Sequence, residues 1–185
     1  MKDALIVIDV QEAVMENSYQ EKETIEQINE LILRARSNQI PIIYVQHEYP
    51  IGPMKRGEPN WQLHEHLEKP LESDIIINKT LPNAFSDTSL KEVLNQMDIR
   101  HVYICGAQTD FCVDSTCRGA FDNHYDVTLI TDAHTTTDKS HMTSEQIINH
   151  VHQTLENFWS PKATLTLQKS DEVKWMVTQT EGGIK

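Results

Sequence analysis

Short apolar runs alternate with amphipathic stretches along most of the chain. Continuous apolar runs of strand length occupy residues 4–8, 42–45, 75–77, 102–105 and 127–130. Runs that are apolar throughout are typical of strands buried on both faces, as in parallel sheets. Residues 163–167 alternate between apolar and polar positions, which predicts a sixth strand closer to an edge of the sheet.

The stretches between these runs have helical periodicity. Apolar residues recur at intervals of three and four in residues 21–37, 90–97, 113–121 and 147–158. Strands that alternate with helices predict an α/β fold, a three-layer sandwich around a six-stranded, mainly parallel sheet. The sequence has no internal repeat and no long linker, so we expect one domain over residues 1–185.

One long segment between the second and third predicted strands interrupts this pattern. Residues 48–61 contain three prolines and two glycines and show no clear period. Long loops inside compact domains are often lids or binding loops. Trp61 ends the segment, and it either closes over a substrate or anchors the loop to the core.

Composition narrows the classes of function. The chain has 185 residues and a formal net charge of -12, which makes nucleic acid a poor partner because phosphate backbones repel an acidic protein. No apolar run reaches the roughly 18–20 residues that a bilayer span needs, so we expect no membrane partner. The first residues lack a cleavage site typical of a signal peptide. Three cysteines without a CxxC pair favour a cytoplasmic location, where thiols stay reduced.

The candidate chemistry follows the predicted strands. Ligands of open α/β sheets bind beyond the carboxyl ends of the strands. Asp9 follows the first strand, Lys79 follows the third, and Cys112 lies shortly after the fourth. Each residue has a purely structural alternative: Asp9 as a helix cap or ion-pair partner, Lys79 as a solvated side chain, and Cys112 as a small core residue. The shared position at one edge of the sheet favours a functional site.

Cys112 is the candidate nucleophile among the three cysteines. We expect it near the start of a helix, with Thr109 or Asp110 as the cap. Such a position can lower a cysteine pKa from about 8.5 to roughly 3.5–7.5, and the thiolate is the reactive form. Backbone N–H groups at a helix start can also bind the oxygen of a tetrahedral intermediate.

The ordered set of these residues resembles the isochorismatase-like cysteine hydrolases, which include nicotinamidases, N-carbamoylsarcosine amidases and streptothricin hydrolases. The matching stretches are residues 5–11, 78–79, 105–113, 118–120 and 125–133. The resemblance extends over roughly residues 4 to 168 and implies the family's three-layer fold. It also implies a homodimer or a homotetramer, because family members are commonly oligomers.

The resemblance implies a role for each matching residue. Cys112 would be the nucleophile, Asp9 the general base, and Lys79 the cation that orients Asp9 and stabilises negative charge. The family has a cis peptide before the nucleophile loop, which maps to the Ala107–Gln108 bond. The N–H groups of Gln108 and Cys112 would then form an oxyanion hole.

Three further residues are candidates for binding the substrate. Gln11 matches a polar position near the family's site, although a structural hydrogen bond explains it equally well. Trp61 and Phe111 are candidate walls of the pocket.

The sequence departs from the nicotinamidase branch after the second strand. That branch binds a metal with an Asp-x-His motif, whereas His47 and Tyr49 stand at the two positions here. We therefore expect no metal and no cofactor. His47, Glu48, His64 and His66 could in principle still build a metal site, but their spacing matches no known motif.

These observations predict a cysteine hydrolase that cleaves a C–N bond in a small amide or lactam through a thioester. Two alternatives stay open. Isochorismatases proper hydrolyse an enol ether on the same fold, and in that branch the nucleophile position is not a cysteine. A non-catalytic binding or regulatory protein on the same scaffold is the second alternative.

Overall fold

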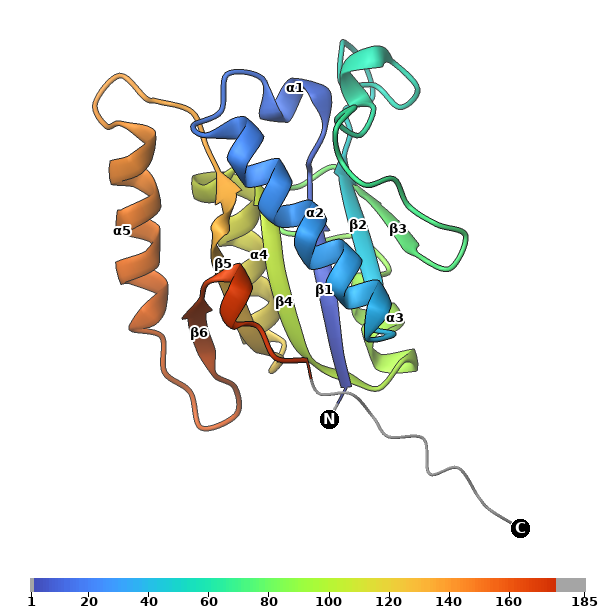
Figure 1. The fold of residues 1–185 in the computed structure, drawn as a ribbon, viewed down its shortest axis with the longest axis vertical. Helices are drawn as coiled ribbons and strands as arrows, with labels where there is room; N and C mark the ends of the chain where they lie inside the picture. Colours follow the sequence, from blue (N-terminus) through green and yellow to red (C-terminus); the bar gives the residue numbers. More distant parts are fainter. Residues whose placement is uncertain (1, 176–185) are drawn as a thin grey trace.

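The computed structural model describes residues 2–175 of the protein, and its centre is a six-stranded parallel sheet (Figure 1). The strand order is β3-β2-β1-β4-β5-β6, and every printed pairing is parallel. The strands are β1 (Lys2–Ile8), β2 (Ile42–His47), β3 (Ile75–Lys79), β4 (Ile99–Ala107), β5 (Asp126–Thr135) and β6 (Leu165–Gln168). The predicted α/β fold class with a mainly parallel sheet is confirmed.

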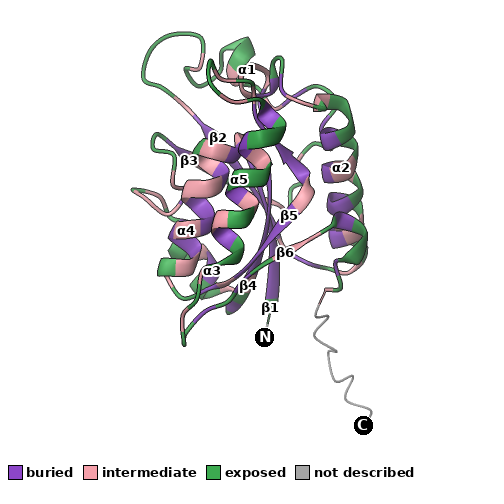
Figure 2. Ribbon diagram, turned by 90° about the vertical axis from the view of Figure 1, so that its left-hand side faces the viewer, coloured by how far each residue is buried: buried purple, intermediate pink, exposed green. Residues whose placement is uncertain are grey.

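Helices cover both faces of the sheet and make three layers (Figure 2). The helical elements are α1 (Glu12–Met15), α2 (Glu21–Ser37), η1 (Pro59–Trp61), α3 (Leu90–Gln96), η2 (Thr109–Val113), α4 (Asp114–Asp122), α5 (Ser144–Glu156) and η3 (Ser170–Glu172). One apolar cluster joins α2 to one face, and a second joins α3, α4 and α5 to the other.

The central strand shows how the apolar runs produce this layering. Side chains alternate across a strand, so a run buried on both faces feeds two cores. In β1, Leu5 and Val7 pack in the cluster with α2, whereas Ile6 and Ile8 pack in the cluster on the opposite face. All four residues are at most 1% exposed.

The structure extends several predicted elements. The second and third strands reach His47 and Lys79, and the fifth strand continues past Ile130 to Thr135. Residues 131–134 therefore lie within β5, not after it. The register between β4 and β5 shifts between Ile104 and Gly106, and this irregularity lets the longer strand stay paired. The short elements α1, η1 and η3 have no counterpart in the sequence prediction.

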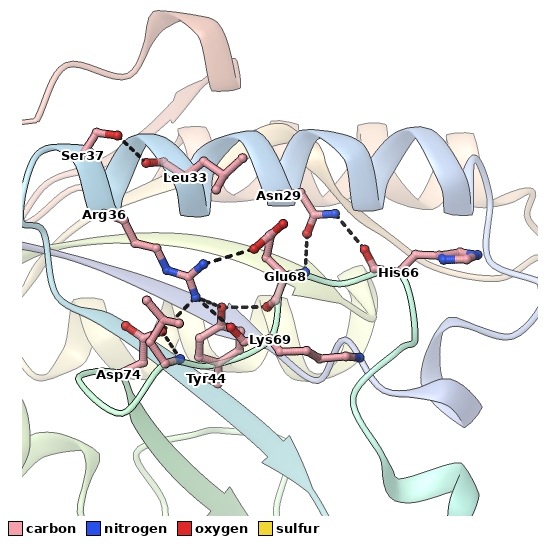
Figure 3. A network of polar contacts seen from close by, with 10 residues as sticks. Asn29, Leu33, Arg36, Ser37, Tyr44, His66, Glu68, Lys69 and Asp74 are labelled. Atoms are coloured by element: carbon pink, nitrogen blue, oxygen red, sulfur yellow. Dashed lines mark hydrogen bonds and ion pairs between the residues drawn. The ribbon is translucent and has the colours of Figure 1, made fainter.

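A polar network anchors the long connection between β2 and β3 to α2 (Figure 3). Arg36 donates hydrogen bonds to Glu68, to Asp74 and to the Lys69 carbonyl. Asn29 donates to the His66 carbonyl and accepts from the Glu68 N–H. The second half of the connection is therefore tied to a rigid helix, while residues 48–57 reach out near the carboxyl edge of the sheet.

The helices of residues 2–175 include none with the length and apolar character that crossing a bilayer would require.

Candidate active site

Three chemically distinct side chains meet at the carboxyl ends of the strands. Asp9 directly follows β1, Lys79 is the last residue of β3, and Cys112 lies in the π-helical turn η2 after β4. Asp9 has a φ of 49°, a left-handed conformation that is uncommon for residues other than glycine. Such strained backbone often occurs at functional sites.

The Lys79 ammonium is the centre of this group. Its Nζ lies 2.7 Å from Asp9 Oδ2, 3.2 Å from Cys112 Sγ and 2.9 Å from His47 Nδ1. The side chains of Asp9 and Lys79 are 0% exposed, so this is a buried ion pair. A carboxylate oxygen of Asp9, a ring nitrogen of His47 and the sulfur of Cys112 all lie within 4.8 Å of one another. The structure therefore brings together the three residues that the sequence indicated.

Asp9, His47 and Cys112 line a cavity of about 310 Å³, whereas Lys79 is not among its lining residues. Its other walls are mostly apolar side chains from α1, from the loop after β2 and from the turn that contains Cys112. The lining residues are Asp9, Ala13, Val14, His47, Tyr49, Met54, Pro82, Gln108, Phe111 and Cys112. The size and the apolar walls suit a small organic molecule.

The expectation of a lowered cysteine pKa is wrong. Burial, followed by the charge of Asp9, raises the pKa of the Cys112 thiol to about 12, and Lys79 only partly opposes this. Desolvation therefore outweighs any effect of the helix start, and this shift favours the neutral thiol of Cys112. Cys105 and Cys117 are fully buried, and burial raises their thiol pKa values as well.

Burial also shifts the pKa values of Asp9 and His47, which line the same cavity. Burial raises the pKa of the Asp9 carboxyl, while the Lys79 ammonium opposes the shift. Burial and Lys79 together lower the pKa of His47 to about 4, so its imidazole is neutral near pH 7. The site thus contains one ion pair, a neutral thiol and a neutral imidazole.

The predicted cap of the nucleophile helix is also wrong. The helical turn begins at Thr109 after Gln108, and no side chain caps it. Thr109 instead shares a 2.8 Å hydrogen bond with the buried His134, and Asp110 accepts a hydrogen bond from Thr136. Thr109 thus ties the turn to β5, whose extension past residue 130 was not predicted, and Asp110 ties it to the residue that follows β5. These contacts fix the backbone that positions Cys112.

The backbone just before this turn is unusual. The Ala107–Gln108 peptide bond is cis, at the position where the family resemblance places one. Gly106 has a φ of 120°, and a Cβ there would lie 2.0 Å from the Ile8 carbonyl oxygen. Only glycine permits this close approach of β4 to β1, where Gly106 pairs with Ile8, the residue before Asp9.

The three candidate binding residues lie in different surroundings. Phe111 lines the cavity and is about half exposed. Gln11 is fully buried, and its amide exchanges hydrogen bonds of 2.7 and 3.0 Å with the His47 backbone. Gln11 also donates to the Trp61 carbonyl. Neither Gln11 nor Trp61 is among the described residues that line the cavity.

The geometry around Lys79 bears on metal binding. Asp9, His47 and Cys112 are the one group of at least three potential ligands that residues 2–175 bring within reach of one ion. The Lys79 ammonium already contacts all three side chains, so a metal there would have to lie against a positive charge. Glu48 pairs with Arg56, and His64 lies 3.3 Å from Glu21 outside this group.

Sequence reasoning missed the place of His47 in this site. It considered His47 only as a possible metal ligand, whereas the imidazole accepts from Lys79 and lines the cavity. The parallel register pairs His47 with Lys79 across β2 and β3. That register was the missing signal, because both residues end adjacent strands of the sheet.

Comparisons with known proteins agree with this arrangement. A family model described as the isochorismatase domain matches residues 3–156. A crystal structure of an isochorismatase family protein superposes with a TM-score of 0.78 at 32% identity, covering 88% of this chain and 96% of that one.

Two curated relatives have named activities. Streptothricin hydrolase from Streptomyces noursei is 30% identical over 139 residues, covering 73% of this chain and 50% of that protein. A ureidoacrylate amidohydrolase, RutB, from Caulobacter segnis is 33% identical over 98 residues, covering 53% of this chain and 41% of that protein. The matched regions thus span at most half the length of these two relatives. The family model, however, spans most of this chain, and the chain belongs to the isochorismatase-like cysteine hydrolase family.

Proposed function

We propose that this protein is an amidohydrolase that cleaves a C–N bond in a small amide or lactam through a thioester on Cys112. The observation that carries the proposal is the meeting of Cys112, Asp9 and Lys79 at one cavity of about 310 Å³. The names of two relatives, a streptothricin hydrolase and a ureidoacrylate amidohydrolase, support hydrolysis.

The first half of the reaction forms the thioester. Cys112 Sγ attacks the carbonyl carbon, and Asp9 takes the thiol proton as the S–C bond forms. Because the resting thiol is neutral, proton transfer has to accompany the attack. The raised pKa of Asp9 makes its carboxylate a better base than an exposed one. Asp9 then gives the proton to the leaving amine as the C–N bond breaks.

The second half releases the acid. Asp9 takes a proton from water, the resulting oxygen attacks the thioester, and the S–C bond breaks to return the thiol with that proton. Lys79, 3.2 Å from the sulfur, stabilises the negative charge that develops there. The backbone N–H groups of Gln108 and Cys112 bind the oxyanion in both halves. The nucleophile, the base, the cation and the oxyanion donors are all groups of this chain, and the proposed path uses no cofactor.

The biological setting is part of the same proposal. Three free cysteines suit a reducing cytoplasm. The family resemblance supports a homodimer or homotetramer.

A hydrolysis assay on a panel of small amides and lactams tests the proposal. We expect Cys112→Ala to fold and to lose hydrolysis, while Cys117→Ala, which changes a buried cysteine of α4 outside the cavity, keeps it. Undiminished hydrolysis by folded Cys112→Ala would overturn the proposal. A wild-type protein that binds but hydrolyses none of the panel would favour a binding or regulatory role.

A further inference from the structure

The Lys79 ammonium already contacts three polar side chains, and Lys79 is not among the described residues that line the cavity. A lysine ammonium carries three N–H donors and no acceptor. Its Nζ lies within hydrogen-bonding distance of Asp9 Oδ2, Cys112 Sγ and His47 Nδ1, at 2.7, 3.2 and 2.9 Å. Recognition of a polar substrate group at this end of the cavity therefore needs another donor.

The contact with Lys79 determines which nitrogen of His47 bears the proton. Because an ammonium can only donate, His47 Nδ1 has to be the acceptor of this hydrogen bond. The neutral imidazole then bears its proton on Nε2. The ring is held in place from behind, since the buried Gln11 amide bonds both the N–H and the carbonyl of the His47 backbone.

The resulting Nε2–H is a buried donor without a partner. His47 is 7% exposed, and its Nε2 has no hydrogen-bond partner among the described residues. A buried donor left unsatisfied destabilises the folded protein, which calls for an explanation in a well-packed site. The His47 ring lines the cavity and packs edge-on against Tyr49, with ring centroids 4.8 Å apart. Tyr49 lies on the loop after β2, lines the same cavity and is about half exposed.

We propose that His47 is a substrate-binding residue whose Nε2–H donates to a second acceptor of the substrate, a carbonyl oxygen other than the one under attack. This inference rests on the proposed amide hydrolysis, in which the scissile oxygen binds the N–H groups of Gln108 and Cys112. It assigns His47 a role in choosing among amides, separate from the proton transfers at Asp9.

The charges around the cavity indicate that this second group is uncharged. Asp9 is the one acidic residue among the lining residues, and Lys79, which forms an ion pair with it, does not line the cavity. A substrate carboxylate would meet the Asp9 charge without a free cation among the lining residues. The remaining walls, including Val14, Met54 and Phe111, are apolar. The preferred substrate class is therefore a small, uncharged amide with a second carbonyl group.

Two amides of similar size provide the probes: malonamide, which has a second carbonyl, and butanamide, in which an ethyl group replaces the second carboxamide. The protein is labelled with ¹⁵N in histidine, and both amides are titrated into it near pH 7. Loss of one side-chain signal in His47→Asn identifies His47, because asparagine can still accept from Lys79 but offers no group at Nε2. His150→Asn, an exposed change on α5, is the matched control.

We expect the free protein to show His47 with its proton on Nε2. Malonamide should shift that signal and bind about tenfold more tightly than butanamide, the effect of one hydrogen bond. The preference should disappear in His47→Asn and persist in His150→Asn. A proton on Nδ1, equal affinities in the wild type, binding of neither amide, or a preference that survives His47→Asn would overturn the inference. Because binding needs no turnover, these outcomes are separate from loss of hydrolysis in Cys112→Ala, which tests the proposed function.

Discussion

Removal of the Lys79 ammonium should destabilise the protein strongly. In Lys79→Met the apolar stem is retained, but the Asp9 carboxylate loses its partner at 2.7 Å while its side chain stays 0% exposed. Breaking a buried ion pair by removing one partner costs about 3–5 kcal/mol. With a urea m value of about 2–3 kcal/mol/M, the unfolding midpoint should fall by about 1–2.5 M.

The stability that Lys79→Met loses relative to wild type should depend on pH, and the direction of this dependence can be predicted. Burial already raises the pKa of Asp9, and Lys79 is the group that opposes the shift, so the variant has a still higher pKa. The folded variant then binds a proton more readily than its unfolded chain, and its stability falls as the pH rises from the unfolded toward the folded pKa. The difference in free energy of unfolding between wild type and Lys79→Met should therefore become smaller when the pH is lowered from about 7 to 5, by at most about 1.4 kcal/mol per pH unit.

Urea unfolding followed by circular dichroism measures both effects. Lys91→Met, an exposed change on α3, is the matched control and should stay within about 0.5 kcal/mol of wild type. Adding Asp9→Asn to Lys79→Met should recover a large part of the loss, since no charge then stays buried. A loss below about 1 kcal/mol, or one that grows as the pH falls, would refute the reasoning.

Two further predictions concern the thiol of Cys112 and the close packing of Gly106 against β1. The Asp9 charge raises the pKa of Cys112, so Asp9→Asn should speed alkylation of Cys112 by iodoacetamide near neutral pH. The same variant should slow amide hydrolysis about 10²–10⁴-fold. Slower alkylation of Cys112 in Asp9→Asn would contradict this prediction. Gly106→Ala would place a Cβ 2.0 Å from the Ile8 carbonyl oxygen and should lower the melting temperature. Gly52→Ala is the control, because Gly52 also has a positive φ but a Cβ there would meet nothing within 4 Å, and it should lower the melting temperature far less. Equal decreases in melting temperature would contradict the packing argument.

The sequence predicted the sheet well because burial on both faces leaves a strong local signal. The helix expected over 21–37 is α2 at the same bounds, since its buried residues recur at helical spacing. The extension of β5 to Thr135 could not be foreseen, because it depends on a register shift against β4. Short elements such as η1 leave too little periodic pattern to detect.

The candidate site was partly predictable for a related reason. Asp9, Lys79 and Cys112 follow strands, and a parallel sheet gathers the carboxyl ends of its strands at one edge. The pKa of Cys112 was not predictable, because it depends on how deeply the sulfur is buried beside Asp9. The interaction of His47 with Lys79 required the register between β2 and β3.

The most direct test of the central claim is mass spectrometry of the intact protein, quenched with acid during turnover of an amide that it hydrolyses. A covalent thioester predicts a population heavier by the acyl group, and peptide mapping should place that mass on Cys112. We expect the adduct to be absent from Cys112→Ala. Rapid hydrolysis with no acyl adduct, or an adduct on another residue, would contradict the account.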